Sequence, residues 1–356
     1  MKAKKNQSDI TATLLSWYSE HKRELPWRET ADPYLIWVSE VILQQTRIAQ
    51  GTSYYLRFVN RFPNVQMLAE AEEEEVLKLW QGLGYYTRAR NLHVAAKQIM
   101  SRFNGIFPAN YSDILSLKGV GKYTAAAISS IAFHAPYAVV DGNVFRVIAR
   151  LFAVEVPIDN KEGQKIISEI AQSLIHTGQP GTYNQAIMDF GSLVCTPARP
   201  KCAECPLQAV CVAYETKKVS YFPVIRPKPP VRNRYFNYLH IIQGGKTFIQ
   251  KRNNTDIWKN LYEFPLIETP DSVDLFQLFQ TSDFRHLFPE IITLSIDHRF
   301  TLKHQLSHQA IHSKFYRVEI AEETVFTPPE RLICIDEKEL SGYPVSRLTE
   351  KYMETI

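Results

Sequence analysis

The chain has 356 residues, of which 45% are hydrophobic and 22% are charged, so we expect two or three domains with ample apolar material for their cores. Its net charge of +4 is too small to indicate a nucleic-acid partner by itself. The basic start MKAKKNQSDI is followed by no signal-peptide core, and no apolar run reaches membrane-spanning length. These features exclude a membrane partner and predict a cytoplasmic protein of a reducing compartment.

Residues 1–216 carry the apolar periodicity of helices. Apolar side chains recur with a period of 3.6 in residues 34–59, 76–79 and 166–175. The glutamates at 72–75 are interpreted as a helix start, because carboxylates are favoured near the positive end of the helix dipole. We therefore expect an all-α domain over residues 1–216.

Glu40 is the first candidate for chemistry in this domain. At helical spacing it shares a face with Ile36, Leu43 and Gln44. A carboxyl group with apolar neighbours keeps its proton more readily, as a general acid must. The alternative is a partly buried glutamate paired with an arginine such as Arg47, and this segment taken alone favours that alternative.

A glycine turn follows in residues 81–90, where Leu83 and Tyr85 precede Arg88 and Arg90. Aromatic and basic residues on a loop are suited to insertion into a stack of bases. The alternative is a turn whose tyrosines pack in the core.

Residues 117–124 place Gly119 and Gly121 on either side of Val120, directly before a helix expected over residues 125–131. Such a hairpin directs its amide N–H groups outward and binds phosphate oxygens without reading base identity. A simple turn is the alternative, but the flanking helices favour a helix-hairpin-helix motif.

Asp141 follows two valines and precedes an apolar helix expected over residues 144–151. The common role of such an aspartate is to cap the helix. A carboxylate in this position can also face a cleft and stay ionised, because the helix dipole and amide donors lower its pKa.

Four of the five cysteines gather in residues 195–211, with the spacing C-x6-C-x2-C-x5-C. Zinc sites usually combine two short cysteine pairs across a longer insert, whereas one short pair flanked by single cysteines favours an iron–sulfur cluster. Zinc remains the alternative, and disulfides are disfavoured in an intracellular chain.

Residues 217–234 are basic and rich in proline, which predicts a semi-rigid linker. After it, residues 238–242, 247–250 and 313–319 are short and rich in β-formers, and Gly244-Gly245 indicates a hairpin. We expect an α+β domain over residues 235–356.

In this order the motifs resemble the helix-hairpin-helix DNA glycosylases with an iron–sulfur cluster, and within them the MutY-type adenine DNA glycosylases. The matching segments are residues 25–28, 39–46, 82–86, 117–124, 141–144 and the four cysteines, with a looser likeness from residue 235 onward. The resemblance implies a multidomain chain: an all-α glycosylase domain (1–216) with a 4Fe-4S cluster loop, the linker (217–234) and a smaller α+β Nudix-like domain (235–356) that recognises 8-oxoguanine.

The implied activity is base excision repair. A monomeric, nucleoid-associated enzyme would act on double-stranded DNA and hydrolyse the N-glycosidic bond of adenine opposite 8-oxoguanine or guanine. By resemblance Glu40 protonates the base and Asp141 stabilises the sugar cation, while Tyr123 and Asn143 orient these carboxyl groups. Endonuclease III-type enzymes carry a nucleophilic lysine where this chain has Tyr123, so a monofunctional glycosylase is implied. Lys122 does not replace that lysine, because one residue along a helix turns a side chain by about 100° and so points Lys122 away from the Tyr123 position.

The alternatives are an endonuclease III-like glycosylase with lyase activity, a catalytically silent iron–sulfur DNA-binding protein and, more weakly, a Nudix pyrophosphohydrolase. The last lacks support, because the metal-binding glutamates of a Nudix box do not follow Pro265.

The resemblance also implies contacts to DNA and to the cluster. Trp27, Arg28 and Leu43 would line the adenine pocket, and Gln45 and Thr46 would touch the base opposite or the gap that the extruded adenine leaves. Leu83 and Tyr85 would form the wedge inserted into the base stack, and the phosphate contacts would come from Gly119, Gly121 and Lys122. Contacts to 8-oxoguanine would come from Ser307 and His308, and the cluster ligands would be Cys195, Cys202, Cys205 and Cys211. Leu306 stands where relatives carry an aromatic residue, which weakens the case for stacking there.

Overall fold

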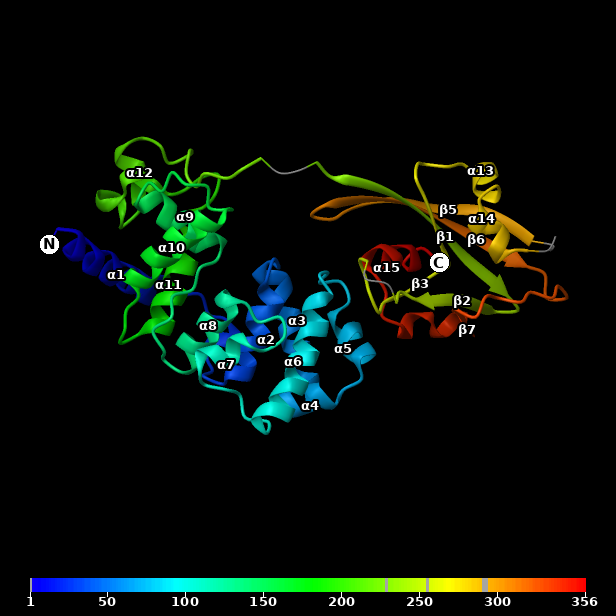
Figure 1. The fold of residues 1–356 in the computed structure, drawn as a ribbon, viewed down its shortest axis with the longest axis horizontal. Coiled ribbons are helices and arrows are strands. Elements are labelled where there is room, and N and C mark those ends of the chain that lie inside the picture. The colour runs from blue at the N-terminus through cyan, green and yellow to red at the C-terminus, as the bar shows by residue number, and fades with distance from the viewer. Residues whose placement is uncertain (1, 228–229, 254–255, 290–293) are drawn as a thin grey trace. The chain divides into compact units, whose positions relative to one another are not determined.

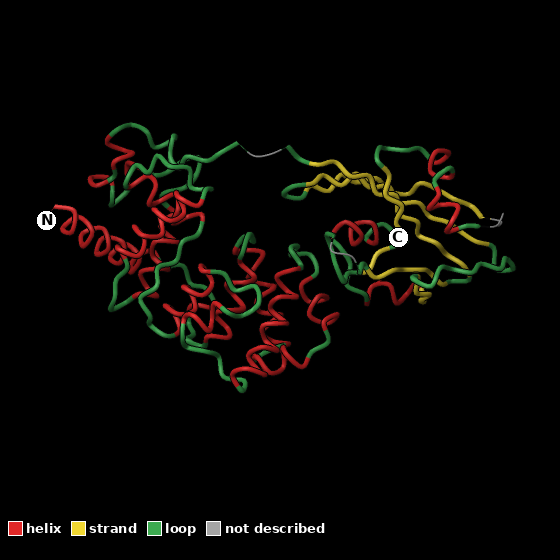
Figure 2. Tube along the Cα trace, in the orientation of Figure 1, coloured by secondary structure: helices red, strands yellow, loops and turns green. Residues whose placement is uncertain are grey.

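The computed structural model describes residues 2–227, 230–253, 256–289 and 294–356, so Lys228 and Pro229 of the expected linker lie outside the described residues. The chain forms two compact units, Met1–Glu70 with Asn91–Pro227 and Ala71–Arg90 with Lys228–Ile356. Helices make up the first unit, and a β-sheet with helices makes up the second (Figures 1 and 2). The expected order of an all-α part followed by an α+β part is confirmed. Among the described residues, no helix is long and apolar enough to cross a membrane.

Residues 2–215 fold into α-helices and short 3-10 helices (Figure 1). In chain order they are α1 (Lys2–His21), η1 (Pro26–Arg28), α2 (Pro33–Leu43), α3 (Ile48–Arg61), α4 (Val65–Glu70), α5 (Glu73–Trp80), α6 (Thr87–Phe103), α7 (Tyr111–Leu115), α8 (Lys122–Ala132), α9 (Gly142–Leu151), α10 (Lys161–Leu174), α11 (Pro180–Leu193), η2 (Cys202–Glu204), η3 (Gln208–Val210) and α12 (Val212–Glu215).

The helical period of residues 34–59 is confirmed, and the structure divides this run into two helices. Helix α2 ends at Leu43 and α3 begins at Ile48. Between them Gln45 has a φ of 57°, in the left-handed region that a right-handed helix cannot include. The break leaves residues 44–47 as a loop at the end of α2.

A core of apolar side chains fixes the helices that carry the candidate site. Helix α11 packs against α1, α8 and α9. Leu14, Ala127, Ile148 and Tyr183, one from each of these four helices, are buried in the same cluster. Because α8 and α9 are held from behind by this core, the residues at their N-termini have fixed positions.

The described residues of the second unit contain a seven-stranded mixed sheet. Five of its strands follow the order β3-β2-β1-β6-β5, while β4 pairs with β1 and β7 pairs with β2. Its later elements are β1 (Arg232–Gln243), β2 (Lys246–Lys251), β3 (Tyr262–Glu263), β4 (Leu266–Thr269), α13 (Leu275–Phe279), α14 (Ser282–Leu287), β5 (Leu294–Gln305), β6 (Gln309–Ile320), β7 (Leu332–Asp336), η4 (Glu337–Gly342) and α15 (Arg347–Met353). Strands β1 and β6 are parallel, and the other named strand pairs are antiparallel.

Alternating side chains of β1 supply two separate cores, as the two-residue period of a strand requires. Phe236 and Tyr238 pack on the face covered by η4 and α15. Leu239 and Ile241 pack on the face covered by α13 and α14. The sheet is therefore the middle layer of three.

The expected hairpin at Gly244-Gly245 is confirmed. Ile242 pairs with Thr247 across the turn, and the two glycines have φ values of 55° and 74°. Such values suit glycine and allow the tight connection between β1 and β2.

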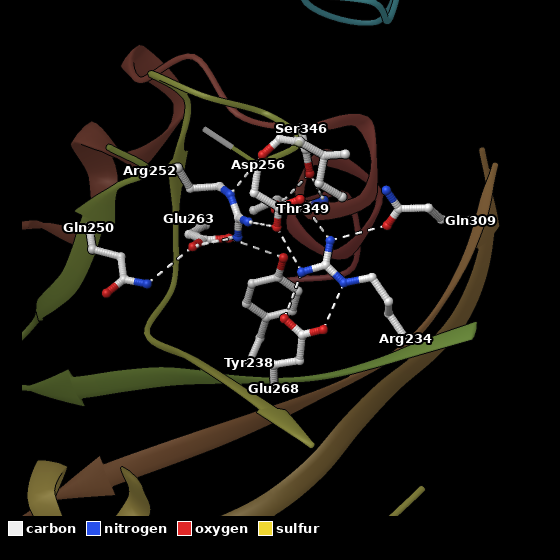
Figure 3. Close-up of polar contacts among 11 residues, drawn as sticks. Arg234, Tyr238, Gln250, Arg252, Asp256, Glu263, Glu268, Gln309, Ser346 and Thr349 are labelled. Atoms are coloured by element: carbon white, nitrogen blue, oxygen red, sulfur yellow. Dashed lines mark hydrogen bonds and ion pairs between the residues drawn. The ribbon is translucent and has the colours of Figure 1, made fainter. Parts of the chain in front are cut away.

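A network of ion pairs joins β1, β3, β4 and the segment that follows β2 in the second unit (Figure 3). Arg234 lies 2.7 Å from Asp256 and 2.6 Å from Glu268. Arg252 lies 2.8 Å from Glu263 and 3.0 Å from Asp256. Each of these carboxylates faces a guanidinium group, so the charges within this network are compensated.

Candidate active site

A cavity of about 1010 Å³ opens in the first unit, between the N-termini of α8 and α9 and the C-terminal end of α2. Many of the expected site residues line it together: Trp27, Arg28, Glu40, Leu43, Gln45, Thr46, Gly119, Gly121, Tyr123, Asp141 and Asn143. Lys122 is exposed and lines an adjoining cavity of about 740 Å³ instead. Residues that are distant in the sequence therefore converge on one hollow, which is large enough to admit a small organic molecule.

Glu40 projects from α2 and is only 8% exposed. Its Oε2 atom accepts a hydrogen bond of 2.6 Å from the hydroxyl group of Tyr123. Burial raises the pKa of Glu40 to about 7, against the opposing effects of the Tyr123 hydrogen bond and the Arg28 charge, while the Asp141 charge raises it further. Near pH 7 a substantial share of Glu40 side chains therefore carries a proton, as a general acid requires.

Tyr123 stands on the first turn of α8 and keeps its own proton. Burial, followed by the charges of Glu40 and Asp141, raises its pKa well above the ordinary value. The sulfur of Met188 lies 3.4 Å from the hydroxyl group. The neutral phenol therefore acts as a donor that fixes the direction of the Glu40 carboxyl group.

Asp141 is the N-cap of α9, as its position before the helix indicates. Its Oδ1 accepts from the backbone N–H groups of Asn143 (2.9 Å) and Val144 (2.8 Å), and its Oδ2 accepts from Asn143 Nδ2 (2.7 Å). The expectation that these donors lower its pKa is wrong in net direction: burial raises the pKa of Asp141, and the hydrogen bonds only oppose that rise. The three donors still favour the charged carboxylate.

Arg28 meets an aspartate that sequence reasoning missed. Its Nη1 and Nη2 donate to Oδ2 and Oδ1 of Asp189 at 2.7 and 2.8 Å. Arg23 also pairs with Asp189, whose side chain is completely buried in α11. Gln185 is a second missed lining residue, and its Oε1 accepts from Tyr18 at 2.8 Å. The one available signal for Asp189 was an acidic residue inside the apolar face of a helix.

The apolar and loop residues of the expected base pocket differ in exposure. Trp27 is 6% exposed and meets Tyr55 edge to face, with 5.3 Å between the ring centroids. Leu43 and Thr46 are half-buried, and Gln45 is exposed. The pocket therefore has a rigid aromatic wall and a polar rim at the break after α2.

The hairpin between α7 and α8 needs glycine at Gly119. This residue has a φ of 77°, and a Cβ there would lie 2.5 Å from the Cβ of Asn91. Gly121 is the N-cap residue of α8, and a Cβ there would meet open space. The backbone N–H groups of Lys118 and Val120 are bonded to Gln98 Oε1 at 2.7 Å and to the Leu117 carbonyl at 3.1 Å, and a phosphate contact at this turn stays a prediction.

The remaining expected DNA contacts lie within the second unit. Leu83 is 9% exposed, so of the expected wedge pair only Tyr85, at 51%, presents most of its side chain to solvent. The Tyr85 hydroxyl lies 2.7 Å from Ser307 Oγ. Ser307 and His308 are exposed in the turn between β5 and β6, whereas Leu306 packs against the core beside it.

Cys195, Cys202, Cys205 and Cys211 all line one small cavity of about 30 Å³. Burial raises the pKa of Cys205 to about 11, and nearby thiols add to the rise. Arg150 Nη1 lies 3.4 Å from Cys195 Sγ. Within the described ranges, no group of three or more His, Cys, Asp or Glu side chains is arranged around a single metal ion. Four thiols around one hollow, beside a guanidinium group, fit the donor set of an iron–sulfur cluster.

Comparison with known proteins assigns the family. The HhH-GPD superfamily model of base excision DNA repair proteins matches residues 38–173, and a NUDIX domain model matches residues 237–355. The adenine DNA glycosylase of Buchnera aphidicola subsp. Baizongia pistaciae is 36% identical over 304 residues, which cover 84% of this chain and 83% of that protein. The chain belongs to the adenine DNA glycosylase family. It is an enzyme of base excision DNA repair that binds DNA and hydrolyses N-glycosidic bonds.

The helical part of this adenine DNA glycosylase has the same fold as solved structures of other DNA repair enzymes. A thermostable thymine-DNA glycosylase superposes with a TM-score of 0.57 and 31% identity, over 61% of this chain and 100% of that one. An endonuclease III in a non-covalent DNA complex superposes with a TM-score of 0.52 over 60% of this chain and 97% of that one, and at 21% identity it supports the fold alone.

Proposed function

We propose that this protein removes adenine opposite 8-oxoguanine or guanine in double-stranded DNA, as a monomeric and monofunctional glycosylase. One observation carries the proposal: a carboxyl group with a pKa of about 7, Glu40, and a carboxylate held by three donors, Asp141, line the same cavity. Two carboxyl groups at one site, one that gives a proton and one that stabilises positive charge, are the machinery of glycosidic bond hydrolysis. The adenine reaches them by leaving the base stack.

In the proposed reaction Glu40 donates its proton to N7 of adenine. The C1′–N9 bond then breaks, its electron pair leaves with the base, and the sugar becomes a cation stabilised by the Asp141 carboxylate. Ionised Glu40 takes a proton from water as the water oxygen bonds to C1′. The products are free adenine and an abasic site, and Glu40 regains its proton.

Tyr123 supports the monofunctional part of the proposal. A lyase of this superfamily needs an amine at this position to form a Schiff base with the sugar. The Tyr123 hydroxyl is instead committed to Glu40 at 2.6 Å, and Lys122 is exposed outside the cavity lining. We expect the DNA strand to stay intact after base removal.

The four cysteines support a 4Fe-4S cluster in residues 195–211. When bound, the cluster would cross-link the four cysteines and so hold this loop. The positive charge of Arg150 would lie close to the negatively charged cysteine thiolates. Arg150 donates to the carbonyl groups of Thr196 and Pro197 at 2.7 and 2.9 Å, so the chain orders the start of the loop from α9.

The turn between β5 and β6 supports recognition of the opposite base. Ser307 is exposed and its hydroxyl group can bond a base edge. Replacing it with alanine is expected to reduce excision opposite 8-oxoguanine more than excision opposite guanine. Ser295 on β5 is the matched control for loss of a hydroxyl group outside this turn. Equal losses with both opposite bases would oppose this role for Ser307.

The test of the proposed activity uses duplexes with adenine opposite 8-oxoguanine, adenine opposite guanine, and thymine glycol, with half of each sample treated with alkali. We expect adenine release from the first two and strand breaks only after alkali. Glu40→Gln should bind these duplexes and release no adenine, whereas Glu169→Gln, an exposed change on α10, should behave as wild type. Cleavage at thymine glycol without alkali would support the endonuclease III-like alternative.

A further inference from the structure

We propose that Asp189 is a positioning residue that keeps Glu40 in its proton-bearing form, by fixing Arg28 and neutralising its charge. This inference rests on the proposed function, because it concerns the residue that would protonate adenine. Its basis is an ion network in the lining of the cavity, in which half-buried Arg23 and Arg28 hold the buried Asp189.

The geometry of the network fixes Arg28. Its two terminal nitrogens donate in parallel to the two carboxylate oxygens of Asp189, at 2.7 and 2.8 Å. Arg28 Nη1 also donates to the backbone carbonyl of Arg23 at 3.1 Å, and Arg23 Nε donates to Asp189 Oδ1 at 3.1 Å. A planar guanidinium held at both nitrogens has one orientation. Asp189 therefore decides where the positive charge of Arg28 lies relative to the cavity.

The charges that face Glu40 come from three elements. Arg28 of η1 favours its ionised form, Asp141 at the start of α9 favours its protonated form, and Tyr123 of α8 donates to the ionised form. Arg28 is thus the cation that works against a proton on Glu40. Because charges interact strongly in a buried site, a carboxylate bonded to that guanidinium weakens its effect on Glu40.

The charges around Asp189 do not balance by themselves. Arg23 and Arg28 carry two positive charges against one negative charge, and Tyr18 of α1, whose pKa is raised mainly by burial, adds none. Removing the Asp189 charge would raise the net charge of these three side chains from +1 to +2. The ordinary alternative is that the two half-buried arginines serve only to compensate the buried charge of Asp189, which would affect folding without altering the titration of Glu40.

Asp189→Asn separates these two roles, because it keeps the shape of the side chain and removes its charge. The measurement is the single-turnover rate of adenine release from an A:8-oxoguanine duplex as a function of pH. We expect the alkaline decline in rate, which follows loss of the Glu40 proton, to move down by about half a unit to one unit, giving a threefold to tenfold loss on the alkaline side. On the acid side the rate should approach that of the wild type.

The matched control is Asp159→Asn. Asp159 also pairs with an arginine, Arg226, at 3.0 Å, but the pair is exposed and lies outside the cavity lining. This variant should keep the wild-type pH profile. A profile for Asp189→Asn that falls equally at every pH, or that matches the wild type, would overturn the inference.

Arg23→Gln gives a second test that does not leave two arginines unpaired. It keeps the Arg28–Asp189 pair and removes one positive charge, so the alkaline decline should move to higher pH. A decline that stays in place or moves down would contradict the electrostatic role even if Asp189→Asn fails to fold. Absence of adenine release from the wild type would instead count against the proposed function, so the two failures are distinguishable.

Discussion

The hydroxyl group of Tyr123 lies 2.6 Å from Oε2 of Glu40, and this contact joins the first turn of α8 to the C-terminal half of α2. Burial alone favours the neutral carboxyl group, whereas the phenol donor favours the ionised one. The pKa of about 7 is the balance of these effects. A group balanced in this way can give a proton and take one back at neutral pH.

Tyr123→Phe should shift this balance toward the protonated form. Loss of the donor removes a stabiliser of the ionised carboxylate, so the pKa of Glu40 rises above about 7 and the alkaline decline in adenine release moves to higher pH. We expect a shift of about half a unit to one unit. The control is Tyr137→Phe, an exposed tyrosine stacked on Tyr111. A decline that moves to lower pH would show that the hydrogen bond favours the neutral carboxyl group.

Asp141→Asn should suppress excision while leaving α9 intact. An asparagine side chain can still accept from the backbone N–H groups at the start of α9, so the cap is retained. The negative charge that would stabilise the sugar cation is lost, and a reduction of about 100-fold or more in single-turnover rate follows.

The control for this change is Asp274→Asn at the N-cap of α13, where the same substitution removes a capping charge in the second unit. Circular dichroism should show unchanged helix content for both variants. A wild-type excision rate for Asp141→Asn would exclude the electrostatic role of Asp141.

Local patterns were sufficient to predict much of this molecule. The helical period of residues 166–175, the glycine pair at 244–245 and the β-rich segments all predicted the elements that the structure contains. The grouping of Glu40, Tyr123 and Asp141 followed from the order of motifs and the family resemblance, and the structure places all three on one cavity.

What the sequence did not reveal depends on long-range contacts. Residues 34–50 contain neither glycine nor proline, so nothing local signals the left-handed conformation of Gln45 that ends α2. Asp189 meets Arg23 and Arg28 from more than 160 positions away, and a lone aspartate in a helix gives no indication of such partners. Similarly, the net rise in the pKa of Asp141 reflects burial, which only the packed structure determines.

Cys205→Ser tests the cluster without relying on activity. If the four cysteines hold a 4Fe-4S cluster, the purified wild type should be brown with absorbance near about 400 nm, and the variant should lose that absorbance. Cys334→Ser is the control, because Cys334 is exposed on β7 and distant in sequence from the others. A colourless wild type that contains zinc would overturn the cluster assignment.

Glu263→Gln should destabilise the second unit through an uncompensated buried charge. Arg252 and Glu263 lie 2.8 Å apart, and each side chain is 4% exposed (Figure 3). Breaking such a pair by neutralising one partner costs about 3–5 kcal/mol, because the desolvated cation loses its strongest stabiliser. Asp256, at 3.0 Å from Arg252, is shared with Arg234 and compensates only in part.

Urea unfolding of the full-length chain measures this effect, with Glu319→Gln as the control. Glu319 pairs with Arg317 at 2.7 Å on β6, but its side chain is 53% exposed. Exposed pairs of this kind contribute about 0–1 kcal/mol. If the two variants unfold at the same urea concentration, the Arg252–Glu263 pair is not a net stabiliser, and the sheet depends on its two apolar cores alone.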